Sequence, residues 1–308
     1  MRAQDDMPVK DPSDLGYDEP IGWPEEIRAA FRHGATVSPE QMERRRQCRR
    51  HHTVPIYLQR LFTEAEQLHA INQETKQAFQ TAPHNLFCEK GANTVVDEDG
   101  KLRSDVEGVF AYIDSRVSTT VKRIVEVMRL RRIQLTKAQR TPDEIDLTLD
   151  EANQWELDAV ALWCSQRKRN PHNPDLEELA SASKTVKAKM LFNLWRVTLD
   201  QGAVDELWGE RELTVGVALG HGFVVGDELA NLVETDGRSD RLPVIPIARD
   251  VCLLWRRRPP ERSGRWFQFE WLDDALVDTV NSVTAARSRV IAGPCRAQLE
   301  RVACIGCD

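Results

Sequence analysis

The sequence contains no hydrophobic run that approaches the roughly 18 residues needed to cross a membrane. Residues 1–6 also lack the basic and then apolar layout of a secretory signal. These two absences predict a protein of the cytoplasm that has no membrane partner. The seven cysteines are an odd number scattered along 308 residues, which is not the layout of a secreted disulfide framework, so we expect reduced thiols.

Several motifs of familiar chemistry are missing as well. There is no Gly-x-x-x-x-Gly-Lys-Ser/Thr loop, no dinucleotide fingerprint and no Gly-x-Ser-x-Gly elbow. A nucleotide triphosphatase, a nicotinamide enzyme and a serine hydrolase therefore lack support. Cys304 and Cys307 form a single Cys-x-x-Cys pair, with Cys295 upstream and no second pair at a matching distance, so a thiolate metal site is not favoured.

The net charge of −7 argues against a protein coated with basic surface for nonspecific binding of nucleic acid. Positive charge is nevertheless dense in four short runs, at residues 44–50, 129–132, 167–169 and 256–258. Runs of this kind are usually solvated helix faces, and they are also places where a nucleic acid binds. Nucleic acid is therefore the expected partner if the basic runs have a function.

Hydrophobic periodicity predicts helices in the first two thirds of the chain. Residues 1–22 have none and predict a flexible lead-in. A short amphipathic helix is expected from Pro55, followed by a hairpin that joins residues 67–73 to 77–81. Apolar residues at spacings of three and four then predict three long helices, from about Ser104 into the 130s, from Thr148 to before Pro171, and from Pro174 to before Gly202.

After Gly202 the pattern changes to short runs rich in β-branched and aromatic residues. These runs predict strands in an antiparallel sheet, at 213–219, 222–226, 242–247, 251–255 and 266–269. A helix at 272–287, a strand at 289–291 and a helix at 294–302 follow. The predicted fold class is α+β, with a central helical bundle and a C-terminal antiparallel β-sheet.

The predicted domain organisation is a single two-lobed domain at residues 23–291. Its helical lobe covers about 104–202 and its β-rich lobe about 203–291, and a tail helix follows at 292–308. Cys164 and Cys252 lie in apolar runs and are expected in the core. The tryptophans mostly fall on buried periodicities, so we expect them to anchor the core and the interface between the lobes.

Two adjacent histidines, His51 and His52, stand directly before the helix that begins at Pro55. The positive end of a helix dipole favours neutral imidazole, which is the form that binds a metal ion or accepts a proton. Adjacent residues in an extended segment point to opposite sides. One histidine is therefore expected to serve a site and the other to have a structural role.

The stretch from His51 to Phe62 resembles the His-His-x-Val-Pro-x-x-Tyr-Leu-x-x-Phe signature of a widespread bacterial family, a domain of unknown function. Further residues agree with the family pattern: Pro83, Asn85, Glu89, Glu107, Gln166, Arg169, Pro171, Asp227, Asn281, Ala286 and Arg287. Asp227 follows a hydrophobic strand where the family has Ser-Asp-Asn-Pro, and Gly226, Glu228 and Leu229 replace the usual neighbours. The resemblance covers about residues 48–291. It indicates which residues are candidates for a site, but it does not imply a particular reaction.

These residues, together with those that the resemblance ranks, predict a site. A histidine that meets Asp227 and Glu89 would form a mixed nitrogen and oxygen site suited to Mg²⁺, Mn²⁺ or Zn²⁺, next to arginines that hold phosphate. The predicted catalytic residues are His51, His52 and Asp227. The predicted metal ligands are His52, Asp227, Glu89 and Glu107. The predicted substrate contacts are Arg50, Gln166, Arg169 and Asn281. This set suits metal-assisted hydrolysis of nucleic-acid phosphodiesters.

The alternative is a non-catalytic binding or regulatory module, in which the helical lobe docks a partner and the histidine pair is a structural junction between the lobes. If the residues form no site, one histidine is expected to bond a backbone carbonyl and Asp227 to cap a turn. The string His-His-x-Val-Pro also occurs in small histidine-containing nuclease motifs. Those motifs continue into a hairpin and a helix around the metal, whereas here a helix follows directly, so that likeness is weak.

Overall fold

The computed structural model describes residues 50–90, 95–96, 102–103, 105–138, 149–169, 201–234, 241–258 and 268–305. All of them belong to the unit Val37–Asp308. The predicted lead-in at 1–22 and the third long helix at 174–202 lie outside the described residues, apart from the last two positions of that helix. The described elements combine helices with sheets, so the predicted α+β class is confirmed in its coarse form.

Two long helices, α4 (Asp105–Ala138) and α5 (Leu149–Arg169), pack against each other. Both helices were predicted from the spacing of apolar residues, and these two predictions are confirmed. Both helices have a buried apolar face, because residues three and four apart fall on one side of a helix, and the contact between them also contains the ion pairs Arg169–Asp114 and Arg116–Asp158. The buried side chains of this face include Val117, Val121, Ile124, Met128, Val160 and Leu162. A bundle with a third helix stays a prediction, because that helix is not described.

A five-stranded sheet has the order β12-β7-β11-β10-β9. Its strands are β7 (Arg211–Ala218), β9 (Asn231–Glu234), β10 (Arg241–Ala248), β11 (Val251–Arg257) and β12 (Gln268–Leu272). The prediction of a wholly antiparallel sheet is wrong, because β12 runs parallel to β7. Both edges of β11 are occupied by β7 and β10, so the next strand reverses direction and joins the far edge of β7 instead. Strand β9 was not predicted.

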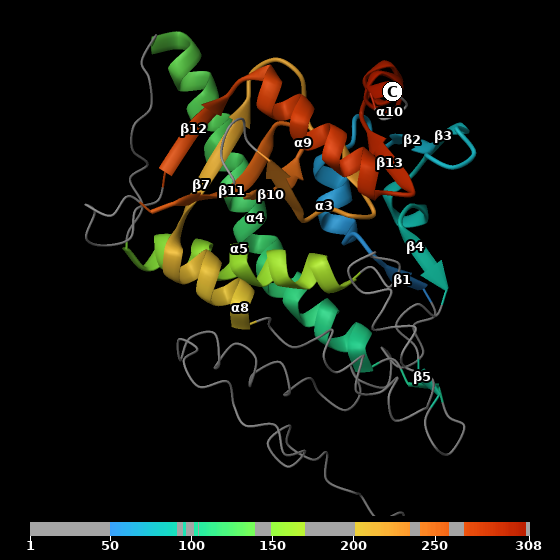
Figure 1. Cartoon of the computed structure of the whole chain (residues 1–308), viewed down its shortest axis with the longest axis horizontal. Coiled ribbons are helices and arrows are strands. Elements are labelled where there is room, and N and C mark those ends of the chain that lie inside the picture. Colours follow the sequence, from blue (N-terminus) through green and yellow to red (C-terminus); the bar gives the residue numbers. More distant parts are fainter. Residues whose placement is uncertain are drawn as a thin grey trace, which may run out of the picture. The chain divides into compact units, whose positions relative to one another are not determined.

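A second sheet has the order β3-β2-β13-β8. The predicted hairpin forms its first half, as β2 (Leu68–Asn72) and β3 (Ala78–Thr81), and β13 (Val290–Gly293) pairs with β2. The predicted strand at 222–226 joins this sheet and not the first, and only Val225–Gly226 forms β8. The hairpin therefore lies beside a strand more than 200 residues away in the chain (Figure 1).

Helices α9 (Asp274–Arg287) and α10 (Arg296–Ile305) contact each other, and α10 also packs on β2 and β13. The carboxylate of Asp273 caps α9, accepting a hydrogen bond from the Leu276 backbone N–H at 2.8 Å. A small apolar core lies between these helices and the second sheet, formed by Ile71, Val224, Ala285, Ile291, Leu299 and Val302. The predicted helices at 272–287 and 294–302 are thereby confirmed.

The helices are tied to the first sheet by aromatic and ionic contacts. The rings of Trp163 on α5 and Trp255 on β11 meet edge to face, with centroids 5.5 Å apart. Arg129 on α4 binds both carboxylate oxygens of Asp250, at 2.9 and 3.2 Å. The expectation that tryptophans anchor the core holds for this pair, and Cys164 and Cys252 are buried as predicted.

The histidine pair lies on a short strand near the start of the described residues. Strand β1 (Arg50–His52) forms a two-stranded ladder with β4 (Cys88–Lys90). Helix α3 (Ile56–Leu61) begins directly after Pro55, as predicted, and contacts the short 3₁₀ helix η2 (Pro83–Asn85). Strands β5 (Val95–Val96) and β6 (Leu102–Arg103) form a second small ladder. No helix in the described part of the chain is both long and apolar enough to cross a membrane.

Candidate functional site

The two histidines lie on strand β1 and therefore face opposite sides of the ladder with β4. His51 stands opposite Glu89, and His52 stands opposite Cys88. Residues opposite each other in a ladder place their side chains on the same face. His51 is fully buried, whereas the Glu89 side chain is 41% exposed. The ladder thus brings one histidine, His51, to the predicted carboxylate.

His52 has a backbone partner. Its Nδ1 lies 3.3 Å from the Leu86 carbonyl oxygen, and a carbonyl only accepts, so Nδ1 carries a proton and donates it to this carbonyl. Gln59 Nε2 donates to the same carbonyl at 3.3 Å and to that of Val54 at 2.7 Å. Phe87 has a φ of 49°, a left-handed conformation that costs roughly 1–3 kcal/mol. These contacts fix the chain just before β4 against α3.

Asp227 follows β8 and is almost fully buried. Its Oδ1 accepts hydrogen bonds from the backbone N–H groups of Arg289 at 2.9 Å and Val290 at 3.5 Å. Its Oδ2 accepts one from Arg289 Nε at 3.3 Å. Arg289 also lies 4.0 Å from Glu89, measured from a guanidinium nitrogen to Oε2. We call these three residues, Glu89, Arg289 and Asp227, the Arg289 bridge.

Burial and the neighbouring positive charge have opposite effects on the pKa of the Asp227 carboxyl. Burial raises the pKa of its carboxyl, and Arg289 with the two backbone N–H groups lowers it, with a net result above the ordinary value. Arg289 and the two backbone N–H groups therefore offset only part of the cost of burying this charge. Arg289 is 48% exposed, so this cation lies at the edge of the site.

The residue before Asp227 has little space around it. A Cβ atom at Gly226 would lie 2.1 Å from Ser288 Oγ and 2.9 Å from a methyl group of Thr284. Ser288 Oγ accepts a hydrogen bond from the Glu228 backbone N–H at 3.2 Å. The position therefore has no room for a side chain while Ser288 holds the turn that presents Asp227.

A second group of polar residues lies where α3, α4 and α5 meet. Arg169 on α5 donates two hydrogen bonds of 2.8 Å to the carboxylate of Asp114 on α4. Its guanidinium is 1% exposed and lies 4.7 Å from the centre of the Phe110 ring. Burial lowers the pKa of Arg169, but Asp114, Glu107 and Tyr57 raise it by more. Glu107 and Arg169, both predicted site residues, therefore act on each other.

Two donors of this group have no acceptor in the part of the chain that the structure describes. They are the hydroxyl of Tyr57 on α3 and the amide nitrogen of Gln166 on α5, and both atoms are buried. A buried polar group without a partner costs roughly 1–3 kcal/mol. Burial, and then the charge of Asp114, raise the pKa of Tyr57 well above its usual value of 10.0, so the hydroxyl is neutral.

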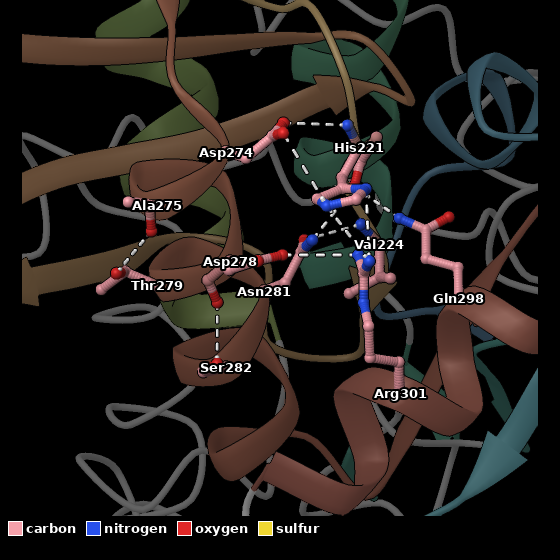
Figure 2. Close-up of polar contacts among 11 residues, drawn as sticks. His221, Val224, Asp274, Ala275, Asp278, Thr279, Asn281, Ser282, Gln298 and Arg301 are labelled. Carbon is pink, nitrogen blue, oxygen red and sulfur yellow. Dashed lines mark hydrogen bonds and ion pairs between the residues drawn. The ribbon is translucent and has the colours of Figure 1, made fainter.

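Asn281, a predicted substrate contact, is fully buried and holds a loop. Its Oδ1 accepts a hydrogen bond from Val224 N at 2.9 Å, and its Nδ2 donates one to Gly222 O at 3.0 Å. Figure 2 shows Asn281 on α9 next to Val224 of this loop. Gln298 of α10 donates to the same Gly222 carbonyl. Backbone groups used in this way cannot pair in a sheet, which explains why β8 begins only at Val225.

The predicted residues therefore fall into separate groups. His51, Glu89 and Asp227 are linked by the β1–β4 ladder and by Arg289, whereas Glu107, Gln166 and Arg169 lie around the junction of α3, α4 and α5. Arg50 pairs with Lys90 through the backbone register. In the described ranges no three side chains of histidine, cysteine, aspartate or glutamate lie close enough together to hold a metal ion.

Three contributors were not predicted: Arg289, Asp114 and the Tyr57 hydroxyl. A signal for Asp114 existed, because it lies seven residues after Glu107 and four after Phe110, on the buried face of one helix. A charged residue on an apolar face indicates a partner on a neighbouring helix. Arg289 gave no such signal, since its partners are far away in the chain.

Comparison with protein families gives a match for part of the chain. The family described as protein of unknown function (DUF4238) matches residues 50–146. The matched segment contains the histidine pair, Glu89, Glu107 and Asp114, and it ends before Gln166, Asp227 and Arg289. No curated protein and no solved structure gives a match to the chain. About a third of the chain is thus similar to a family of proteins of unknown function.

Proposed function

We propose that the chain is a metal-assisted hydrolase that acts on nucleic-acid phosphodiesters. The observation that carries this proposal is the Arg289 bridge. Two carboxylates that are 138 residues apart in the chain, Glu89 and Asp227, share one half-exposed guanidinium. Where two carboxylates lie on either side of a cationic side chain, a divalent ion can take the place of that side chain.

The donor set favours Mg²⁺ or Mn²⁺ over Zn²⁺. Zinc takes three or four protein ligands, and the described residues contain no group of three. Magnesium keeps several of its waters and is held by one or two carboxylates together with the phosphates of a substrate. Glu89 and Asp227 supply these two carboxylates. When bound, such an ion polarises a phosphoryl oxygen and lowers the pKa of its water.

Arg289 has a second role in this proposal. Glu89 and Asp227 would hold a divalent ion in place of the positive charge that Arg289 now supplies to them. The Arg289 guanidinium would then be available to bind a phosphate with two parallel hydrogen bonds. Its 48% exposure gives it the room to turn. His51, opposite Glu89 in the ladder, holds that carboxylate in place as a positioning residue.

The alternative function is a non-catalytic binding or regulatory module. The specific observation in its favour is that predicted substrate contacts have internal partners: Arg169 binds Asp114, and Asn281 binds the backbone of Gly222 and Val224. His52 bonds the Leu86 carbonyl, and Asp227 accepts from backbone N–H groups, as this alternative expects.

The test is hydrolysis of single-stranded DNA, duplex DNA, RNA and bis(p-nitrophenyl) phosphate, each with Mg²⁺, Mn²⁺ or a chelator. The variants are Glu89→Gln, Asp227→Asn and His51→Gln, with Glu74→Gln as the matched control on the exposed turn of the hairpin. We expect metal-dependent hydrolysis by the wild type and by the control. Glu89→Gln and Asp227→Asn should each lose about 100-fold, because the ion supplies several kcal/mol of stabilisation.

Equal activity in the wild type and all variants would overturn the assignment of the site. Absence of metal-dependent hydrolysis of every substrate would overturn the enzyme proposal and favour the binding module. Hydrolysis of bis(p-nitrophenyl) phosphate alone would keep the chemistry and reject nucleic acid as the substrate.

A further inference from the structure

Residues 219–222, which lie between β7 and β8, contact both α9 and α10, and we call them the His221 loop. Gln298 of α10 donates a hydrogen bond to the Gly222 carbonyl. The carboxylate of Asp274, in the first turn of α9, accepts one from the His221 backbone N–H at 3.1 Å. A side chain of this loop that changes its charge can therefore change how the loop is attached to the two helices.

The imidazole ring of His221 lies next to a cation and an anion (Figure 2). One guanidinium nitrogen of Arg301, on α10, is 3.2 Å from each of the two ring nitrogens. Asp274 Oδ2 lies 3.8 Å from the ring Nε2, which is too long for a hydrogen bond. All three side chains are 40–53% exposed, so the ring can exchange a proton with water.

The Arg301 nitrogen lies over the face of the imidazole ring. The lone pair or hydrogen of each ring nitrogen points outward in the ring plane, so a group equally distant from both nitrogens lies along neither direction, and the carbon atom between them blocks the edge. A cation over the face of a neutral aromatic ring is attracted to it. An imidazolium carries a positive charge and repels the same cation. The sign of this contact therefore depends on the charge of the ring.

Protonation has the opposite effect on the contact between His221 and Asp274. At 3.8 Å the carboxylate gains little from a neutral ring, but it forms an ion pair with a charged one. Asp278 follows Asp274 by four residues on the same side of α9, and its Oδ1 accepts a hydrogen bond from Arg301 at 3.4 Å. Arg301 therefore keeps a partner on α9 when a charged ring repels it.

Other charged groups near the His221 loop come from α4 and from the turn between β10 and β11. Between about pH 5 and 8, histidine is the type of side chain that changes charge at its ordinary pKa, whereas aspartate and arginine are not. In the described part of the chain these neighbours are Arg132, which donates to the Leu219 carbonyl at 3.4 Å, Arg249, whose carbonyl accepts from the loop's following residue, and Asp250, which binds Arg129. None of these neighbours is a histidine, so His221 is the group that responds to pH here.

We propose that His221 is a pH-dependent contact that attaches its loop to α10 when the ring is neutral and to α9 when the ring is charged. The neutral ring packs against Arg301. The charged ring releases Arg301 and pairs with Asp274. This proposal rests neither on the Arg289 bridge nor on hydrolysis, so it can fail without them.

The test is a set of double-mutant cycles on the full chain, each measured by urea unfolding at pH 5 and at pH 8. One cycle combines His221→Ala with Arg301→Met. A second combines His221→Ala with Asp274→Asn, which keeps an oxygen for the His221 backbone N–H. A cycle removes the effect of each single variant at a given pH, so other titrating groups cancel.

Two further cycles serve as controls. His221→Phe replaces the imidazole with a ring that stays neutral at both pH values, so its coupling to Arg301 should not change with pH. His84→Ala with Arg301→Met uses a histidine that is exposed on η2. It should show no coupling at either pH.

At pH 8 the contact between His221 and Arg301 should favour the folded state by about threefold, as an exposed cation–π contact does. At pH 5 this coupling should vanish or reverse, and coupling between His221 and Asp274 should rise to about twofold, as in an exposed ion pair. Equal coupling of His221 to Arg301 at both pH values overturns the proposal, and so does a coupling to Asp274 that does not rise at pH 5. The same pH dependence in the His84 cycle would also overturn it, because the effect would then not be local.

Discussion

Single buried side chains decide the charge balance at the junction of α3, α4 and α5. Arg169 is 1% exposed and Asp114 is 21% exposed, so the arginine has little access to water that could replace its partner. Removing one member of a buried pair leaves the other charge uncompensated, whereas replacing both with apolar residues is often neutral. The Tyr57 hydroxyl and the Gln166 amide nitrogen lack acceptors among the described residues. Removing either donor should therefore relieve the free-energy cost of burying it without a partner.

We predict that Arg169→Met lowers the free energy of unfolding by about 3 kcal/mol, because Asp114 then remains charged and half-buried. Adding Asp114→Leu should restore stability to within about 1 kcal/mol of the wild type. Urea unfolding of the wild type, both single variants and the double variant measures these quantities. If the double variant is no more stable than Arg169→Met, the loss of stability in Arg169→Met does not come from leaving Asp114 without its partner.

The control for this comparison is Arg296→Met. Arg296 forms a 2.7 Å ion pair with Glu300 on α10, and both side chains are at least half exposed. Exposed pairs four residues apart on a helix contribute less than about 0.5 kcal/mol. The contrast between Arg169 and Arg296 therefore separates burial from the presence of an ion pair.

We also predict that Tyr57→Phe leaves the free energy of unfolding unchanged or raises it by up to about 2 kcal/mol, because the hydroxyl is buried without an acceptor among the described residues. Chemical denaturation of both proteins checks this. A loss of more than about 1 kcal/mol would mean that the hydroxyl has a partner in the folded protein.

At the scale of elements, one side chain explains where strand β8 begins. Asn281 occupies the backbone groups of Gly222 and Val224, and α9 thereby fixes the segment that leads to Asp227. This segment belongs to the second sheet because β13, the strand after α9, pairs with it. The position of Asp227 thus depends on a helix that follows it by nearly 50 residues.

We predict that Asn281→Ala speeds hydrogen exchange at residues 222–226 and costs about 2 kcal/mol, since it leaves the buried Val224 N–H without its acceptor, while the Gly222 carbonyl keeps its hydrogen bond from Gln298. Exchange mass spectrometry compares this segment with β11, which should be unchanged. The control is Asn85→Ala in η2, where the side chain is exposed. Faster exchange throughout the first sheet as well would contradict a local role.

Sequence patterns predicted which segments form helices and strands better than they predicted which strands pair with each other. The spacing of Val117, Val121 and Ile124 is a local property, and so is the turn between β2 and β3, which explains why α4 and the hairpin could be predicted. The parallel pairing of β12 and the second sheet depend on which edges are already occupied, and a single sequence does not contain that information. Of the site, the prediction joined one histidine to Glu89 and Asp227 and named His52 as the metal ligand, whereas the ladder places His51 opposite Glu89. Arg289 was not predicted, because a lone arginine before a strand resembles any exposed residue.

At the scale of the whole molecule, two aspartates whose pKa values are raised make the folded protein more stable at low pH than at neutral pH. Burial raises the pKa values of Asp114 and Asp227 above the ordinary value of 3.8, despite their arginine partners. A carboxyl with a raised pKa binds its proton more tightly in the folded state. Its stabilising contribution is therefore complete below pH 3.8 and is lost as the pH rises through the raised value.

We predict that Asp227→Asn gains stability relative to the wild type as the pH rises from about 4 to 7, because only the wild type ionises at this position. Melting temperatures of both proteins across this range measure the difference. If the Asp227→Asn variant instead loses stability relative to the wild type over the same range, the carboxylate is favoured in the folded protein.

The central claim is that Glu89 and Asp227 hold a divalent ion in exchange for Arg289. Calorimetric titration of Mn²⁺ into the wild type, Glu89→Gln, Asp227→Asn and the control Glu74→Gln tests it most directly. The account predicts one site in the wild type and in the control, and binding weaker by at least about tenfold in the other two variants, because each loses one of two protein ligands. Equal Mn²⁺ binding in all four proteins, or none in any of them, would contradict it.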